Sequence, residues 1–365
     1  MLAMAAGLAL LLAPARAQAK KLEDSSFVYG IFADNPSCEQ VEQRLAAAPL
    51  RPTVLLSVEN GQGFLLDQAG GGDLLQCALR SLAGAGRTAK ALLLQDPSFL
   101  DRAEESARRM RLLGEFAAAH RKLLAGAVID IEPYVEERWS CATHAGKREI
   151  GGRYLELLRQ LKAASGTLPV EAAVPWWYTL NDDIPELLPG TILEAADGVY
   201  FMVYGDEGGP VVDGRAEKVF DRMPAEKLGV RRGKVYIALA TYESVSAPEL
   251  EAELAAVRGH YAPVRSFAGT AVFHATSEYN APLVRVLSGV VADSEGNGLA
   301  AAQVECCGVK AMTNACGKFT LKGIPEERAT LHVSKGGYAP RAVEVTLFAP
   351  GRERELPPIL LREKK

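Results

Sequence analysis

Two carboxylates interrupt an apolar run near the middle of the chain. The run is GAVIDIEPY, residues 126–134, and its acids are Asp130 and Glu132. Because side chains alternate along a strand, the two acids share one face, while Ile129 and Ile131 share the other. Two acids about 7 Å apart in a partly desolvated place cannot both ionise cheaply, so one should have a raised pKa. Such a carboxyl group suits a general acid.

Strand-like and helix-like segments alternate along the chain, and they predict the elements that position these acids. Between the apolar runs lie stretches of helical period such as residues 101–124, 150–164 and 248–261. Eight apolar runs separated mostly by helices predict an α/β fold, a closed (β/α)8 TIM barrel. An open doubly wound sheet is the alternative, but its Gly-rich phosphate turn is missing after the first run. The eight runs are residues 27–33, 53–59, 90–96, 126–132, 169–177, 198–204, 234–242 and 269–275.

In such a barrel the active site lies at the carboxyl ends of the strands. Val128 would fill the barrel core, and Pro133 would end the strand just after Glu132, which places both acids at the mouth. A buried salt-bridge network with Arg or Lys from a neighbouring strand is the structural alternative. No other predicted strand offers an inward base near its carboxyl end, so the pattern favours a pair of carboxyl groups that take part in function.

The helical period disappears after Pro282, and short alternating runs with frequent turns predict a small all-β sandwich. The segment resembles the carboxypeptidase regulatory-like, transthyretin-like domain. We therefore predict a leader at residues 1–17, a barrel at 18–284 and a sandwich at 285–365. The matching motifs are SGVVAD at 288–293, Gly296-x-Gly298, TNACGKF at 313–319, Ile324-Pro325 and GGY at 336–338.

The stretch 126–134 resembles the fourth-strand signature of family 18 glycoside hydrolases, the chitinase-like group, whose fullest form is D-G-x-D-x-D-x-E. Gly126, Asp130 and Glu132 match, and Val128 replaces the middle Asp. Later strands resemble the family in order. They are Ala173-Val174-Pro175, DGVYFMVY at 197–204 with Gly205 before Asp206, KVYIALATY at 234–242 with Tyr242 at the mouth, and GTAVFHA at 269–275 with His274 where Trp is common.

The resemblance implies a mechanism for an N-acetylated sugar. Glu132 would protonate the glycosidic oxygen while the substrate's own acetamido oxygen attacks the anomeric carbon. Asp130 would hold the acetamido N–H, and Tyr204 would donate a hydrogen bond to its carbonyl oxygen. Asp206, Tyr242 and His274 are further candidates for substrate contact.

Two other interpretations stay open. A retaining glycosidase of the clan A type would use Glu132 as acid and Glu243 as nucleophile, although strand parity turns Glu243 away from the barrel. A barrel that binds polysaccharide or cell wall without cleaving it is the non-enzymatic alternative. Trp176 and Trp177 follow the fifth strand, and since adjacent side chains point to opposite sides, at least one is expected to stack on a sugar.

The composition and the first residues indicate where the protein is located and what it binds. A net charge of −4 gives no basic field for nucleic acid. Residues 1–17 form an apolar run ending in Ala15-Arg16-Ala17, typical of an export signal, and no later run has membrane length. We expect a secreted or periplasmic monomer without cofactor or metal, whose partner is a polysaccharide or cell-wall glycan.

Six cysteines are compatible with export. Cys38 and Cys77 fall near the starts of the first two barrel helices and are expected to pair. Cys141 looks single, and one pair among Cys306, Cys307 and Cys316 would connect two strands of the sandwich. A zinc site is the weaker reading of that group, since no His lies at ligand spacing.

Overall fold

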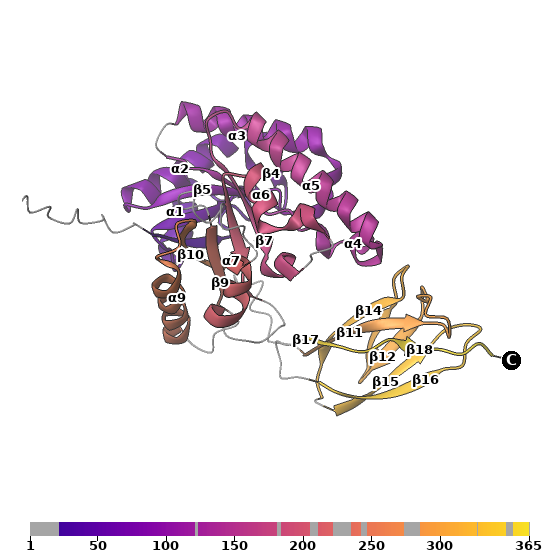
Figure 1. The fold of residues 1–365 in the computed structure, drawn as a ribbon. Helices are drawn as coiled ribbons and strands as arrows, with labels where there is room; N and C mark the ends of the chain where they lie inside the picture. Colours follow the sequence, from indigo (N-terminus) through magenta and orange to yellow (C-terminus); the bar gives the residue numbers. More distant parts are fainter. Residues whose placement is uncertain are drawn as a thin grey trace, which may run out of the picture.

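The larger part of the chain is a closed barrel surrounded by helices, and the smaller part is a β-sandwich beside it (Figure 1). The predicted fold class, an α/β barrel with a C-terminal sandwich, is therefore confirmed. The computed structural model describes residues 22–120, 123–180, 184–204, 211–221, 235–241, 247–273, 285–326, 328–347 and 353–364.

Eight parallel strands close the barrel, and each of the eight predicted runs overlaps one of them, although the first, third and eighth strands begin before the runs that predicted them. The first was placed too late: its strand begins at Glu23 and ends before Gly30, where a positive φ of 72° turns the chain. In hydrogen-bonded order the strands are β1 (Glu23–Val28), β10 (Phe267–Phe273), β9 (Val235–Ala240), β8 (Gly198–Met202), β7 (Val170–Pro175), β6 (Ala127–Ile129), β5 (Thr88–Leu93) and β2 (Thr53–Ser57).

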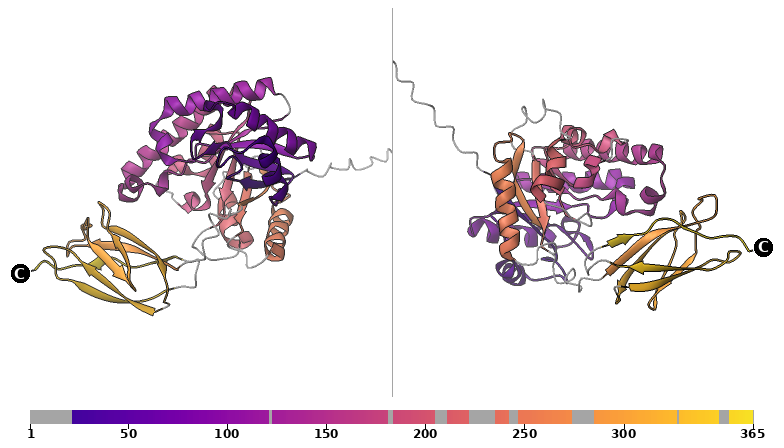
Figure 2. Two further views of the ribbon diagram at one scale, coloured as in Figure 1. Left: turned by 180° about the vertical axis from the view of Figure 1, so that it is seen from behind. Right: turned by 60° about the horizontal axis from the view of Figure 1, so that its bottom comes forward.

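The helices cover the outside of the barrel, and Figure 2 shows the same arrangement from two further sides. The helix predicted at 150–164 begins at His144 in the structure. The Thr143 hydroxyl caps this helix by accepting a hydrogen bond from the N–H of Gly146. The described helices are α1 (Cys38–Ala47), α2 (Gly71–Gly84), α3 (Ala103–Ala119), α4 (Glu137–Cys141), α5 (His144–Ala164), α6 (Pro189–Ala195), α7 (Glu217–Asp221) and α9 (Ala247–Tyr261).

Strand parity divides the core as predicted. Ile129 and Ile131 pack in the apolar layer between strands and helices, whereas Val128 lies inside the barrel with Phe27 and Leu92. The same alternation holds in β9, where Ala238 faces inward and its odd-numbered neighbours face the helices. A short hairpin, β3 (Glu59–Asn60) and β4 (Gly63–Phe64), follows β2.

A buried polar cluster fills the amino-terminal end of the barrel. The Nζ atom of Lys90 lies 2.8 Å from a carboxylate oxygen of Glu23 and 2.9 Å from one of Glu171. The hydroxyl oxygens of Tyr200 and Tyr236 accept from the same ammonium at 2.9 and 3.4 Å. Because Lys90 and Glu171 are only 6% and 4% exposed, this charge is balanced inside the barrel.

The C-terminal part pairs two sheets, in the orders β14-β11-β17 with β18 beside β11, and β13-β12-β15-β16. Leu287, Val304 and Leu331 are among the buried residues between them. The strands are β11 (Arg285–Ala292), β12 (Gln303–Cys306), β13 (Val309–Met312), β14 (Lys318–Ile324), β15 (Arg328–Ser334), β16 (Arg341–Thr346), β17 (Glu353–Glu355) and β18 (Ile359–Leu360).

Two disulfides correct the predicted cysteine pattern in part. Cys38 and Cys77 are bonded, as expected. The predictions for Cys141 and for the sandwich were wrong: Cys141 is bonded to Cys316, and Cys306 and Cys307 are free. Within the described ranges, no helix combines the length and the apolar character needed to cross a membrane.

Candidate active site

Strand β6 carries the two acids to the carboxyl end of the barrel. The strand itself is shorter than predicted and ends at Ile129, although the N–H of Asp130 still donates to the carbonyl of Leu93 at 3.2 Å. The chain then turns at Glu132, and Pro133 opens a 3₁₀ turn that spans Pro133–Val135. Both acid side chains are half-buried at this mouth.

Asp130 is the more perturbed of the two acids. Burial, together with the neighbouring carboxylate of Glu132, raises its pKa to about 8. The Tyr29 hydroxyl donates a hydrogen bond to the Oδ2 atom of Asp130 at 3.3 Å, and this bond lowers the pKa. Its other oxygen, Oδ1, is buried and has no hydrogen-bond partner among the described residues. The hydrogen-bonding capacity of that oxygen is therefore not used by the described residues.

Glu132 also holds a proton more tightly than a free carboxyl group. Burial raises its pKa, and a hydrogen bond donated by the Tyr134 hydroxyl to its Oε1 atom opposes the rise. That bond also fixes the orientation of the carboxyl group. Near neutral pH the pair therefore keeps at least one proton, which is the state that general acid catalysis needs.

The salt-bridge alternative does not describe this pair. In the part of the chain that the structure describes, no Lys or Arg forms an ion pair with Asp130 or Glu132. A third acid, Glu59, contributes to the raised pKa of Asp130, but its own carboxylate is paired with Arg109 at 2.8 Å. Unlike Glu59, Asp130 and Glu132 therefore have no cationic partner among the described residues.

Aromatic rings surround the mouth. Tyr204, predicted to donate a hydrogen bond to the acetamido oxygen of the substrate, packs on Phe273 with ring centroids 5.5 Å apart, and its hydroxyl contributes to the raised pKa of Tyr134. Trp177 is half-buried with its ring 5.0 Å from that of Tyr134. Trp176 is only 2% exposed and packs in the layer of helices, so its ring offers no face to a sugar. Of the two adjacent Trp residues, Trp177 is the one at the mouth.

The sequence reasoning missed several tyrosines. Tyr29 shares the inward parity of Phe27, but the predicted run extended to residue 33, so Tyr29 was not placed at the carboxyl end of the strand. Tyr134 was part of the quoted stretch, yet nothing in its spacing revealed the bond to Glu132. Tyr154 and Tyr178 lie on later elements, and their buried hydroxyls have no hydrogen-bond partner among the described residues. Glu132 contributes to the raised pKa of both, which places them near the acid.

Four other candidates lie outside the described residues. They are Asp206, Tyr242 and His274, which were predicted to contact substrate, and Glu243, the alternative nucleophile. Their roles stay predictions. The parity of β9 through Leu239 is as predicted.

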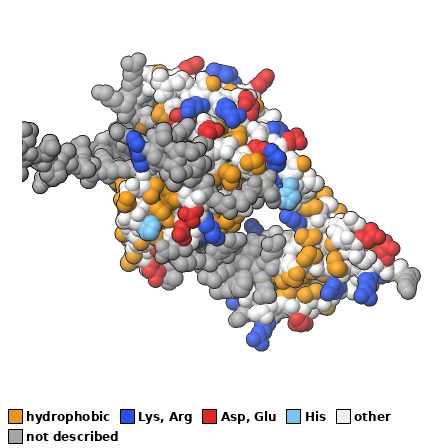
Figure 3. All heavy atoms as spheres, viewed as in Figure 1, with side chains coloured by type: hydrophobic (Ala, Val, Ile, Leu, Met, Phe, Trp, Pro, Cys, Tyr) orange, Lys and Arg blue, Asp and Glu red, His pale blue; other side chains and the backbone are white. Residues whose placement is uncertain are grey.

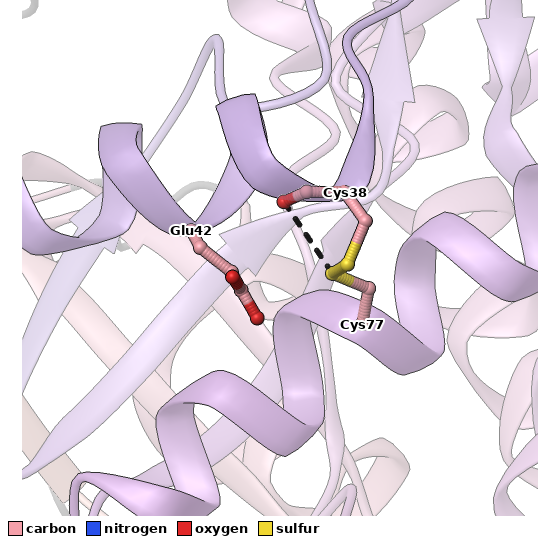
Figure 4. Close-up of side chains that lie close together, drawn as sticks. All are labelled: Cys38, Glu42 and Cys77. Carbon is pink, nitrogen blue, oxygen red and sulfur yellow. Dashed lines mark hydrogen bonds between the residues drawn. A yellow bond between two sulfur atoms is a disulfide. The ribbon is translucent and has the colours of Figure 1, made fainter.

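The described residues offer one group with metal-ligand proximity, and it includes neither Asp130 nor Glu132. Figure 4 shows Cys38, Glu42 and Cys77 side by side on α1 and α2. The two sulfur atoms are joined in a disulfide, so the thiolates that a metal needs are absent. This group is a structural cross-link between two helices.

The raised pKa of Asp130 predicts a pH-dependent gain on its replacement. A carboxyl group whose folded pKa is raised costs stability as pH rises above its unfolded value near 3.8, up to about 8. We expect Asp130→Asn to raise the free energy of unfolding by about 1–3 kcal/mol at pH 8 and by little at pH 4.

Urea denaturation at both pH values measures this effect. Asp67→Asn is the matched control, because a hydrogen bond from Arg108 lowers the pKa of Asp67. That variant should lose stability at pH 8 and lose less as the pH falls toward 3. A destabilised Asp130→Asn at pH 8 would contradict the account of Asp130.

Residues 286–356 match the carboxypeptidase regulatory-like domain. This confirms the resemblance seen in the motifs of that segment, which is less than half of the chain. No curated protein sequence matches the chain as a relative.

Among solved structures, the barrel is similar to glycosidases. A GH18 chitinase from Pseudoalteromonas aurantia is 11% identical with a TM-score of 0.44, covering 71% of this chain and 96% of the other. An exo-beta-1,4-mannosidase from Opitutaceae bacterium strain TAV5 is 11% identical with a TM-score of 0.47, over 69% and 51%. A beta-glucuronidase from Bacteroides uniformis is 10% identical with a TM-score of 0.47, over 93% and 46%. The chain spans about half of the latter two, and likenesses this distant assign it no activity.

Proposed function

We propose that this protein is an exported glycoside hydrolase that cleaves an N-acetylated polysaccharide or cell-wall glycan, with Glu132 as the general acid. The observation that carries the proposal is the pair of β6 acids at the mouth: both have a raised pKa, and neither is paired with a described base. Perturbed carboxyl groups at the carboxyl end of a closed barrel are the groups such enzymes use.

In the proposed reaction, Glu132 gives its proton to the glycosidic oxygen as the bond to the leaving sugar breaks. The acetamido oxygen of the substrate attacks the anomeric carbon, and water later opens the cyclic intermediate. The unpartnered Oδ1 atom of Asp130 would accept the acetamido N–H, which orients the attacking oxygen. Tyr204 would donate to that oxygen and stabilise it.

Val128 replaces the third carboxylate of the resembled signature, and it is fully buried in the barrel core. Asp130 instead receives its hydrogen bond from Tyr29, a neutral group. The proposed site therefore orients Asp130 with a hydroxyl donor, and it places one charge fewer inside the barrel.

The setting of the reaction is part of the proposal. Two disulfides fit a protein that matures in an oxidising compartment, as the leader-like residues 1–17 also suggest. On the face of the molecule seen in Figure 3, acidic and basic side chains are interspersed over the barrel. Interspersed charges give this face no strong field of one sign, which suits a monomer that binds a neutral glycan.

The test compares two substrates that differ in one group. Wild type is incubated with a tetrasaccharide of N-acetylglucosamine and with the same oligomer after removal of the acetyl groups, and new reducing ends are counted. Because the acetamido oxygen is the nucleophile, we expect cleavage of the acetylated oligomer to be at least about 100-fold faster.

Equal cleavage of both oligomers would contradict substrate assistance and favour a protein nucleophile such as Glu243. Tight binding of these oligomers and of peptidoglycan fragments, without cleavage of any, would contradict the enzymatic proposal and favour the binding barrel.

A further inference from the structure

The sandwich is covalently attached to the loop that follows the acid-bearing strand. Cys141 is the last residue of α4, and its disulfide to Cys316 spans 175 positions of sequence. Figures 1 and 2 both show the end of α4 beside the tip of the sandwich. The second domain is thus anchored at the mouth side of the barrel rather than only through the chain that enters it.

The sandwich end of this link is rigid. Cys316 lies in the turn between β13 and β14, where the Oδ1 atom of Asn314 accepts from the N–H groups of Cys316 and Lys318 at 3.2 and 2.9 Å. Gly317 has a φ of 78°, and a Cβ there would collide with the carbonyl of Val291. The turn is therefore held closely against β11.

The barrel end of the link is a short element that needs support. Helix α4 has five residues, too few to be stable alone. Arg138 pairs with Asp101 at 2.6 Å, and the ring of Trp139 is buried with its centroid 6.2 Å from that of Tyr178. The disulfide at Cys141 adds a covalent restraint to these contacts.

Ring contacts continue from α4 to the acid. The buried ring of Tyr178 lies 6.0 Å from that of Tyr134 and nearly perpendicular to it, at 86°. Tyr134 in turn donates its hydroxyl to Glu132. Each step between the disulfide and the acid is thus a covalent segment, a ring contact or a hydrogen bond.

We propose that the C-terminal domain is a brace for the acid, with Trp139 and the Cys141–Cys316 disulfide as positioning groups. Through α4 and Tyr178 they hold Tyr134, and hence the carboxyl group of Glu132, in its working orientation. This inference rests on the proposed function of Glu132, whereas the mechanical link that it describes can be measured without activity.

The experiment removes the link in the full-length protein. Cys141→Ser/Cys316→Ser is compared with Cys38→Ser/Cys77→Ser, which removes the disulfide on the helices α1 and α2. Amide hydrogen exchange is followed in residues 133–141 and 176–180. The first variant should exchange there about 10-fold faster than wild type, and the control should not. Unchanged exchange in the first variant would overturn the brace.

The catalytic readout is taken on the N-acetylated tetrasaccharide. We expect kcat to fall about 10- to 100-fold, with a small change in KM and a shifted alkaline limb of the pH profile, where the general acid loses its proton. Faster exchange with unchanged kcat would overturn the positioning role. If wild type is inactive on every substrate, the proposed function fails, and the exchange result still decides whether the link exists.

A second pair of variants keeps both disulfides. Trp139→Leu removes the ring contact with Tyr178, whereas Trp139→Phe retains an aromatic ring. The brace predicts faster exchange around Tyr134 in Trp139→Leu and near-normal exchange in Trp139→Phe. Equal behaviour of the two variants would contradict the ring path.

Discussion

Replacing Glu132 with glutamine is expected to lower kcat on N-acetylated oligomers by about 10²- to 10⁴-fold, the usual contribution of a general acid. Glutamine has nearly the shape of glutamate, and its amide oxygen still accepts the hydrogen bond from Tyr134. The variant should therefore fold normally and bind the oligomer with nearly unchanged affinity. Initial rates and equilibrium binding, measured together, check both expectations.

The role of the proton can be isolated with a second substrate. An aryl glycoside whose leaving group departs without protonation does not need the acid in its first step. We expect the Glu132→Gln variant to lose much less activity on that substrate than on the oligomer. Glu156→Gln, an exposed acid on α5, is the control and should match wild type on both. Equal losses on the two substrates would contradict acid catalysis by Glu132.

The second large effect concerns stability and lies at the other end of the barrel. Replacing Lys90 with methionine keeps the length of the side chain but removes the charge between Glu23 and Glu171. The buried carboxylate of Glu171 and the partly exposed one of Glu23 would then lie close together without a cation. Breaking a buried ion pair in this way costs about 3–5 kcal/mol, and we expect a loss of that size in the free energy of unfolding.

Urea denaturation measures the loss, and a surface pair gives the control. Lys162 pairs with Asp197 at 2.7 Å, but the two side chains are 41% and 28% exposed. Lys162→Met should cost no more than about 1 kcal/mol, since solvent already screens that pair. Similar losses in the two variants would contradict the account of the buried cluster.

Much of the barrel follows from periodicity alone. The alternation of Val128, Ile129, Asp130 and Ile131 predicts which side chains enter the barrel, because parity depends on local geometry and not on neighbouring strands. The position of the acids at the mouth follows from the same rule. The buried polar cluster escaped prediction because Glu23 precedes the apolar run by which the first strand was recognised.

The support around the acids needs tertiary contacts that spacing does not reveal. Tyr29 and Asp130 are separated by 101 positions, and their hydrogen bond exists only because the barrel brings the ends of β1 and β6 together. The bond between Cys141 and Cys316 depends on where a second domain lies. No local pattern contains that information, so a single-looking cysteine was the natural but wrong interpretation.

The most direct test of the proposed function is a proton NMR time course of wild type with a β-linked N-acetylglucosamine tetrasaccharide. Attack by the substrate's own acetamido oxygen, followed by water, inverts the anomeric carbon twice. We therefore predict that the β-anomer of the product appears first and then mutarotates, and that Glu132→Gln forms neither anomer at a comparable rate. An α-anomer as first product, or undiminished hydrolysis by Glu132→Gln, would contradict the account.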